Sequence, residues 1–344
     1  MRLFRCFVAG LAASVRTETV TLLALLSVSL FAGAVPDTLA ASGVSTYPNR
    51  PVRLIVPFAP GGSDVPARML AQRLGEKMGQ PFVIDNRPGA SGVLGAGIAA
   101  KATPDGYTLL FATASHAVTP SYYEKLPYDA IRDFTPVANV GAVPFSLATH
   151  PSLGASTTKD FIAIAKAKSG QLNYGSAGTG GIGHLTVILL TKQIGFQATH
   201  VAYKGTGPAV VALLAGEMQF GMPNLVGALP HLRSGKLRVL GVASAQRAPS
   251  APEIPTLAEA GVHGAESGTW YCVLAPRGTP PGVIDALNRE IVALLNTQSL
   301  RDQLATVGVI PETGTPLELA RFMRSEIEKW SGVMKYAGLK KESY

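Results

Sequence analysis

Four glycine-containing segments are the places where residue type and spacing in this sequence could do chemistry. Each follows a short apolar run and precedes a stretch with helical periodicity: 58–64 (FAPGGSD), 86–92 (NRPGASG), 176–183 (SAGTGGIG) and 204–208 (KGTGP). The first N–H groups of a helix have no intrahelical partner, and glycine lets backbone approach a ligand closely. Such loops can hold the oxygens of a small anion. A single loop is more often an ordinary turn before a helix, and in the first loop Ser63 or Asp64 would cap the helix that follows whether or not a ligand binds.

Two of these loops imitate a dinucleotide-binding fingerprint. Residues 178–183 fit the spacing Gly-x-Gly-x-x-Gly, and residues 89–95 approximate it. A nicotinamide site also needs an acidic residue about 20 positions further on, at the end of the next strand. The next predicted strands end in Ala-Tyr-Lys (202–204) and Thr-Ala-Ser (113–115), without a carboxylate. We therefore expect no NAD and no other cofactor.

Signatures of enzymes and of metal sites are missing as well. Ser91 and Ser176 lack the Gly-x-Ser-x-Gly frame of a nucleophile elbow, and no Walker sequence occurs. The six histidines show no two-His metal spacing and have no cysteine companion. We predict neither a metal site nor catalysis. Among the histidines, His184 at the start of a helix behind the third loop is the one most expected to touch a ligand.

The first residues predict export. Arg2, Arg5 and Arg16 precede an uncharged apolar run, 20–35, and small residues near Ala40 suit a signal peptidase. We predict a signal peptide over 1–40 and a periplasmic protein, with an uncleaved anchor as the alternative. After its removal Cys272 has no partner, so no intrachain disulfide is expected.

The formal net charge of the chain is +8, which favours small anions. Lysines and arginines are scattered, and no basic run exceeds Lys340-Lys341. We therefore expect no nucleic-acid partner.

Apolar runs alternate with helical periodicity and predict an α/β protein of two lobes. The strand, glycine loop and helix order recurs from residue 51, which predicts mostly parallel sheets covered on both faces. Two apolar stretches within 137–150 leave no room for a helix between them, and 268–276 forms a later strand. We interpret these as two crossings that make a hinge. The first lobe would comprise 47–143 and 268–344 and the second 144–267, with a ligand cleft between them.

The sequence resembles a known family, the receptors of tripartite tricarboxylate transporters, often called Bug receptors. Six motifs carry the resemblance in order: 47–64 (YPNRPVRLIVPFAPGGSD), 83–92 (VIDNRPGASG), 104–110 (PDGYTLL), 201–205 (VAYKG), 254–261 (IPTLAEAG) and 275–280 (APRGTP). The resemblance implies a type II periplasmic binding fold of the Venus-flytrap kind. It also implies that the protein captures a small organic carboxylate and delivers it to membrane permease subunits. We expect a monomer.

The resemblance also implies which residues bind the ligand. They come from the glycine loops and from two further strand ends: Phe58, Gly61, Gly62, Ser63, Asp64, Gly89, Ala90, Ser91, Ser115, Ser176, Gly178, Thr179, Gly180, His184, Tyr203, Lys204, Gly205 and Asn224. The sequence departs from the family where many members carry Gly-Gln-Val-Asp followed by an Asp-Asn pair, because it reads 216–219 (GEMQ) and Pro223-Asn224. The loss of two acidic positions favours an unsubstituted carboxylate or a neutral aromatic acid over an amino acid.

Two other functions would suit the same architecture. The same closing cleft would serve a ligand-binding partner of a membrane signalling protein or, as a further alternative, an exported hydrolase. Within the predicted site we expect backbone donors near Gly61-Gly62 and 178–181 to matter more than cations. Arg68 would lie inside a helix and Arg87 in a turn before proline, which leaves Lys204 at a strand end facing the cleft.

Overall fold

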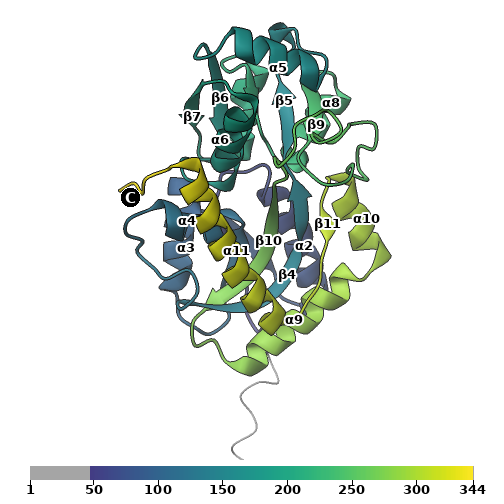
Figure 1. Ribbon diagram of the computed structural model, residues 1–344. Helices are drawn as coiled ribbons and strands as arrows, with labels where there is room; N and C mark the ends of the chain where they lie inside the picture. The colour runs from purple at the N-terminus through teal and green to yellow at the C-terminus, as the bar shows by residue number, and fades with distance from the viewer. Residues whose placement is uncertain (1–46, 344) are drawn as a thin grey trace, which may run out of the picture. The chain divides into compact units, whose positions relative to one another are not determined.

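Two separate β-sheets organise the chain in the computed structural model, which describes residues 47–343 (Figure 1). The first sheet contains, in spatial order, β11 (Ile310–Pro311), β4 (Phe134–Pro144), β10 (Gly268–Pro276), β3 (Thr108–Thr113), β1 (Val52–Val56) and β2 (Phe82–Asn86). The second contains β7 (Ala198–Ala202), β6 (Leu172–Ser176), β8 (Phe220–Gly221), β5 (Ser146–Thr149) and β9 (Arg238–Val242). Each sheet with its helices forms one lobe, as predicted from the sequence.

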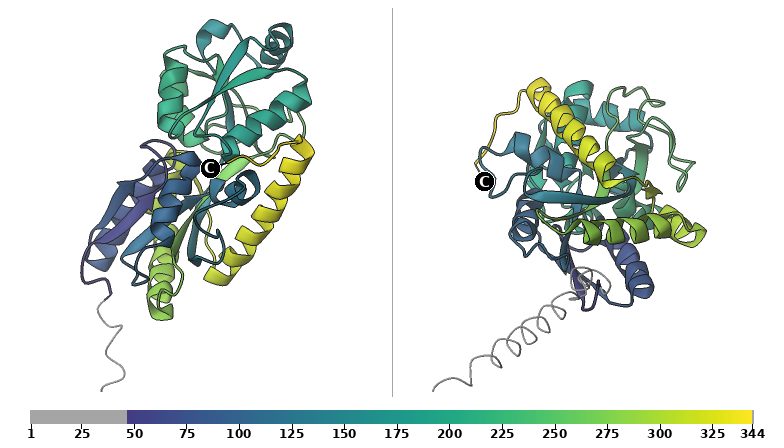
Figure 2. Two further views of the ribbon diagram at one scale, coloured as in Figure 1. Left: turned by 90° about the vertical axis from the view of Figure 1, so that its left-hand side faces the viewer. Right: turned by 90° about the horizontal axis from the view of Figure 1, so that it is seen from below.

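Helices cover both sheets. The first lobe has α2 (Asp64–Met78), α3 (Val93–Ala100), α4 (Ser115–Tyr122), α9 (Pro281–Leu295), α10 (Gln298–Thr306), α11 (Pro316–Ala337) and the short η1 (Ala90–Gly92). The second has α5 (Thr158–Ala167), α6 (Ile182–Ile194), α7 (Thr206–Leu214), α8 (Leu225–Arg233) and η2 (Pro151–Leu153). Figure 2 shows α11, in yellow, running along the first lobe toward the second, where it contacts α6.

The prediction of mostly parallel sheets is confirmed for β1 to β3 and for β6 to β8, and it is wrong for β5 and β10. In the first sheet β1 pairs in parallel with β2 and β3, but β10 runs antiparallel to both β3 and β4. In the second sheet β6 pairs in parallel with β7 and β8, while β5 is antiparallel to β8 and β9. The antiparallel members include the strands that enter and leave the second lobe. A strand that crosses between lobes has no βαβ connection to hold it parallel to its neighbours.

The chain passes between the lobes where β4 ends at Pro144 and β5 begins at Ser146, and it returns into β10 at Gly268. These are the two stretches that the sequence indicated as crossings. The boundaries at 143/144 and 267/268 stay predictions. The predicted signal peptide, 1–40, lies outside the described residues. Within residues 47–343 no helix combines the length and apolar character needed to cross a bilayer.

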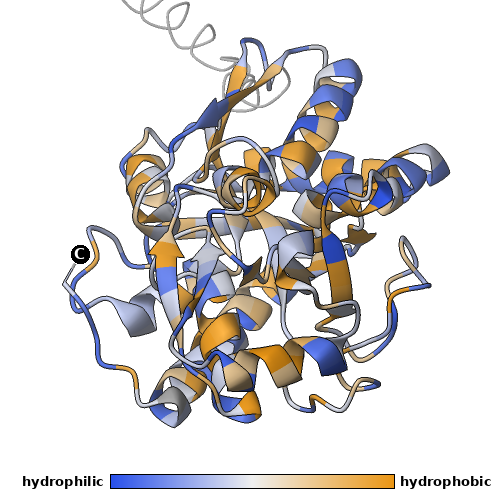
Figure 3. Ribbon diagram, turned by 90° about the horizontal axis from the view of Figure 1, so that it is seen from above, coloured by the Kyte–Doolittle hydropathy of each residue, from blue (hydrophilic) through white to orange (hydrophobic). Residues whose placement is uncertain are grey.

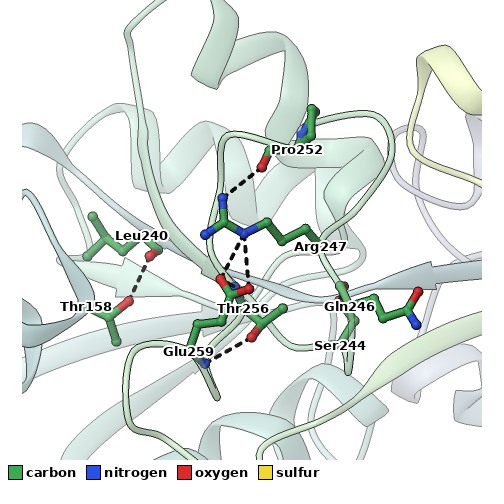
Figure 4. A network of polar contacts seen from close by, with 8 residues as sticks. All are labelled: Thr158, Leu240, Ser244, Gln246, Arg247, Pro252, Thr256 and Glu259. Carbon is green, nitrogen blue, oxygen red and sulfur yellow. Dashed lines mark hydrogen bonds and ion pairs between the residues drawn. The ribbon is translucent and has the colours of Figure 1, made fainter.

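The segment between β9 and β10 is held by side-chain contacts instead of by regular structure (Figure 4). Arg247 Nε lies 2.8 Å from Glu259 Oε2, and its Nη1 donates to the Pro252 carbonyl at 3.1 Å. Glu259 in turn accepts from the Thr256 backbone N–H at 3.1 Å. A residue pair twelve positions apart thus closes this loop before the chain returns to β10.

The hydrophobic core continues from one lobe into the other. One buried cluster joins Ile55 and Leu110 of the first lobe to Phe161 and Phe220 of the second. Helices α5, α9 and α11 are amphipathic, and Figure 3 shows hydrophobic and hydrophilic stretches side by side along the helices. Because the crossing strands are themselves buried, the lobes share apolar packing at the hinge.

Candidate ligand-binding site

A cavity of about 50 Å³ lies where loops of the two lobes meet. Its polar lining consists of hydroxyl and amide side chains from both lobes, namely Ser63, Thr113, Ser115, Ser176, Thr206, Asn224, Thr269 and Tyr271. None of the described residues that line it carries a charged side chain. An anion in this cavity would therefore be held by neutral donors.

Five helices direct their N-terminal ends at this cavity. Ser63 precedes α2, Ser115 begins α4, Gly181 precedes α6, Thr206 begins α7 and Asn224 precedes α8, and each of these residues lines the cavity. A helix N-terminus carries a partial positive charge and backbone N–H groups without intrahelical partners. Their convergence makes the cavity electropositive without a lysine or arginine.

Some residues of the first predicted loop line the cavity, and others contact the second lobe. Phe58 and Ser63 line the cavity, and the Ser63 side chain makes no capping hydrogen bond to α2. Asp64 does not line it. Its carboxylate instead bonds Arg68 Nε at 2.7 Å and accepts from Asn86 Nδ2 at 2.9 Å. Asp64 therefore links the first turn of α2 to the end of β2.

The second predicted loop touches the second lobe instead of the cavity. Ala90 and Ser91 both have left-handed φ angles, 44° and 54°, which residues with a Cβ rarely adopt. This conformation lets the Ser91 hydroxyl donate to the Thr179 carbonyl in the opposite lobe. Gly89 has φ 148° and faces Leu94 of its own lobe. Gly89, Ala90 and Ser91 do not line the cavity between the lobes.

The third loop supplies the densest polar network. Ser176 and Gly178 line the cavity, and the Gly178 N–H donates to Ser176 Oγ at 3.2 Å. The Thr179 carbonyl faces the first lobe and also accepts from Tyr123 Oη at 3.1 Å. Gly180, at φ 70°, packs so closely on Tyr122 that a Cβ would lie 2.1 Å from its ring.

His184 stands behind the third loop and does not line the cavity. Its Nδ1 accepts from the Gly180 N–H at 3.1 Å, and its ring stacks on His200 at 4.0 Å between centroids. His200 Nε2 lies 2.7 Å from Ser176 Oγ. The pKa of both histidines is lowered to about 4, by burial in each case and, for His200, also by the neighbouring His184. At neutral pH both histidines are uncharged, and they support the third loop through their contacts with Gly180 and Ser176.

The fourth loop meets the first lobe through backbone. The Lys204 carbonyl accepts from the Ala59 N–H at 2.9 Å, and a Cβ on Gly205 would lie 3.1 Å from that nitrogen. The Lys204 side chain is exposed, and Tyr203 is half-buried, with its hydroxyl 3.5 Å from Glu217 Oε2. The residues Tyr203, Lys204 and Gly205 therefore join the lobes but do not line the cavity.

Asn224 links the two lobes at the cavity wall. Its Nδ2 donates to Tyr271 Oη at 3.1 Å, and Tyr271 Oη donates to the Gly62 carbonyl at 3.3 Å. Asn224 Oδ1 meanwhile caps α8 by accepting from the Gly227 N–H at 3.1 Å. Gly61 and Gly62 are thus packed against the second lobe, with Gly61 facing Gly207.

Several lining residues were not predicted from the sequence. They come mainly from strands and from the first turn of α7: Thr113, Phe145, Thr206, Thr269 and Tyr271. Thr269 and Tyr271 are two positions apart on β10, so they share a face of that strand. The alternation in this predicted crossing strand could have identified them.

The fold and the cavity define a class of protein, a two-lobed solute-binding protein of the periplasmic type. Residues 66–339 match the family described as "Tripartite tricarboxylate transporter family receptor". The chain is 40% identical over 304 residues to protein BugT of Bordetella pertussis, covering 88% of this chain and 93% of that protein. The chain therefore belongs to the tripartite tricarboxylate transporter receptor family.

Two solved structures resemble the fold closely. One is Rpa4515 of R. palustris with adipate, at TM-score 0.84 and 38% identity, covering 86% of this chain and 100% of that chain. The other is MatC of Rhodopseudomonas palustris with bound malate, at TM-score 0.79 and 33% identity, covering 83% and 99%. These likenesses agree with the family and the two-lobed fold expected from the sequence motifs.

Proposed function

We propose that the protein is a periplasmic receptor that captures a small organic carboxylate between its lobes and delivers it to membrane permease subunits. The observation that carries this proposal is the convergence of five helix N-termini on a cavity without charged lining residues. Such an arrangement favours a carboxylate and excludes a cation. The adipate and malate in the two similar structures are carboxylates of this kind.

The contacts between lobes explain how binding would be coupled to closure. Asn224 with Tyr271, the Ser91 hydroxyl with the Thr179 carbonyl, and Ala59 with Lys204 all join one lobe to the other beside the cavity. A ligand that touches Ser63 and Ser176 at once would add to these contacts. It would therefore stabilise the closed arrangement that a permease can recognise.

The close Ser176–His200 pair does not argue for a hydrolase. A serine nucleophile needs a base whose pKa is near the operating pH. Burial holds the pKa of His200 at about 4, and Ser176 Oγ lies 3.0 Å from the Gly178 carbonyl, to which it donates. We propose no catalytic activity for this pair.

A thermal-shift screen tests carboxylate capture. We expect succinate, adipate, malate or benzoate to raise the melting temperature with concentration, because the ligand binds only the folded protein. Glucose serves as the uncharged control. A shift with glucose and with none of the acids would refute the proposal. Delivery is tested by uptake of the acid that binds, in cells with and without this gene, and unchanged uptake would argue for a sensing role instead.

A further inference from the structure

The cavity has an apolar end that lies wholly within the second lobe. Its wall on one side is α7, from which Ala209, Val210 and Leu213 face the cavity. Helix α7 packs on β6, and the neighbouring strand β8 completes the opposite wall. The helix N-termini lie at the other end, where the lobes meet. The cavity is therefore polar at one end and apolar at the other.

Two glycines form the sheet side of this apolar end. Gly175 of β6 and Gly221 of β8 are register partners, and both line the cavity. Tyr174 and Phe220, the preceding register pair, point to the other face of the sheet, where their ring centroids are 5.6 Å apart. The face toward α7 thus lacks side chains at two adjacent positions. It forms a flat floor of peptide backbone.

The Met218 side chain occupies the space above this floor. A Cβ on Gly175 would lie 2.4 Å from both Sδ and Cε of Met218. Met218 is 2% exposed and packs in the same cluster as Val210 and Leu213. Methionine is unbranched and has three rotatable bonds, so it can move aside for another apolar group. The cavity of about 50 Å³ would then become a slot between the glycine floor and α7.

We propose that the preferred ligand is an aromatic monocarboxylate of the benzoate type. Its ring would lie in the slot in place of Met218, and its carboxylate would face the helix N-termini. This inference rests on the proposed function and names the substrate class of that site. A flat ring fits a floor without side chains, and a methionine sulfur beside a ring is a favourable contact.

The lining argues against a ligand with carboxylates at both ends. A second carboxylate would lie among Val210, Leu213 and Met218, which offer neither charge nor hydrogen-bond donors. Burying a charge without a partner is strongly unfavourable. Malate and adipate should therefore bind more weakly than benzoate.

Titration calorimetry on the full chain with benzoate, malate, adipate and benzyl alcohol tests this inference. We expect benzoate to bind at least about tenfold more tightly than either diacid. Tighter binding of malate or adipate than of benzoate would overturn the aromatic assignment and leave carboxylate capture intact. If none of the three acids bound, or if benzyl alcohol bound as tightly as benzoate, the proposed function itself would fail.

Two variants locate the ring. Gly221→Ala adds a methyl group whose nearest neighbours are the Gly175 carbonyl at 3.4 Å and Pro223 Cδ at 3.8 Å, so the fold tolerates it while the floor is raised. We expect benzoate affinity to fall about tenfold. Gly332→Ala, on α11 with nothing within 4 Å of the added Cβ, is the matched control and should change nothing. Unchanged benzoate affinity in Gly221→Ala would refute the slot.

Met218→Ala makes the opposite change. It removes the side chain above the floor, so 2-naphthoate should gain affinity relative to benzoate. If the ratio of the two affinities did not change, the ring would lie elsewhere in the cavity and the inference would fail.

Discussion

Two adjacent glycines in the first loop are required for different reasons. Gly61 has φ 136°, and its Cα region faces Gly207 so closely that a Cβ would lie 2.7 Å from backbone atoms there. Gly62 does not have a left-handed φ angle, so its backbone conformation is open to residues with a side chain. A Cβ on Gly62 would instead lie 2.7 Å from Asn224 Nδ2 and 3.0 Å from Thr206 Cβ. Gly62 is therefore needed for the approach of the lobes.

Gly62→Val should reduce ligand affinity at least about tenfold, because the branched side chain would push Asn224 and α7 away from the first lobe. Titration calorimetry with the acid that binds best measures the loss, and Gly332→Ala provides the control. A Gly62→Val protein that folds and keeps full affinity would show that the lobes need not meet at this point.

The cations near the site should matter little for affinity. Arg87 Nε lies 2.9 Å from Asp85 Oδ1, and the exposed Lys204 contributes its carbonyl to the interlobe contact. We therefore expect Arg87→Ala and Lys204→Ala to change affinity by less than about threefold, since partly exposed charges in high dielectric interact weakly. Calorimetry at low and at moderate salt checks this. Loss of binding in Arg87→Ala would identify an arginine clamp in place of backbone donors.

At the scale of elements, strand β10 contributes one hydroxyl group, that of Tyr271, which hydrogen-bonds to residues of both lobes. Tyr271 is fully buried, and its Oη joins Asn224 Nδ2 to the Gly62 carbonyl. Tyr271→Phe would leave the Asn224 donor and the Gly62 acceptor unpaired in the interior. We expect a loss of about 1–3 kcal/mol in the free energy of unfolding, measured by urea denaturation. Tyr336→Phe, at 68% exposure, is the control, and an equal loss in both variants would contradict this role.

Most elements could be predicted because they show clear periodicity or turn signals. Helices α9 and α11 begin at Pro281 and Pro316, where the sequence places a proline after the strand, and both crossings appear as apolar stretches. Helix α4 was missed because it is short and contains Pro120, and β8 was missed because it has two residues. The predicted parallel direction was wrong for β5 and β10. These strands connect the two lobes, so no βαβ connection sets their direction relative to their neighbours.

The site was predictable only where a loop opens a helix. Ser63, Ser115, Ser176 and Gly178 follow strand ends and line the cavity. Residues such as Ser91 and Lys204 have the same local sequence signal but serve the contact between lobes, which depends on how the two lobes meet. The apolar slot was not visible in the sequence, because Gly175 and Gly221 become partners only when β6 and β8 pair.

At the scale of the whole molecule, buried neutral histidines connect stability to pH in both lobes. His116 in the first lobe and His184 and His200 in the second each have a pKa lowered by burial to about 4 from the usual 6.5. In the unfolded chain these groups take up protons near pH 6.5, which the folded protein does not. The stability that they contribute is therefore complete above pH 6.5 and is lost as the pH falls toward 4.

We accordingly expect the free energy of unfolding to decrease from about pH 7 to about pH 5, measured by urea denaturation at several pH values. Carboxyl groups with lowered pKa, such as Asp85 and Asp129, lose their contribution only as the pH falls through and below their usual value of 3.8, so this window isolates the histidines. His200→Gln removes one of the buried titrating groups, and the decrease should become shallower even if the variant is less stable at neutral pH. A free energy of unfolding that stays constant across this window would mean that His116, His184 and His200 titrate alike in the folded and unfolded chains.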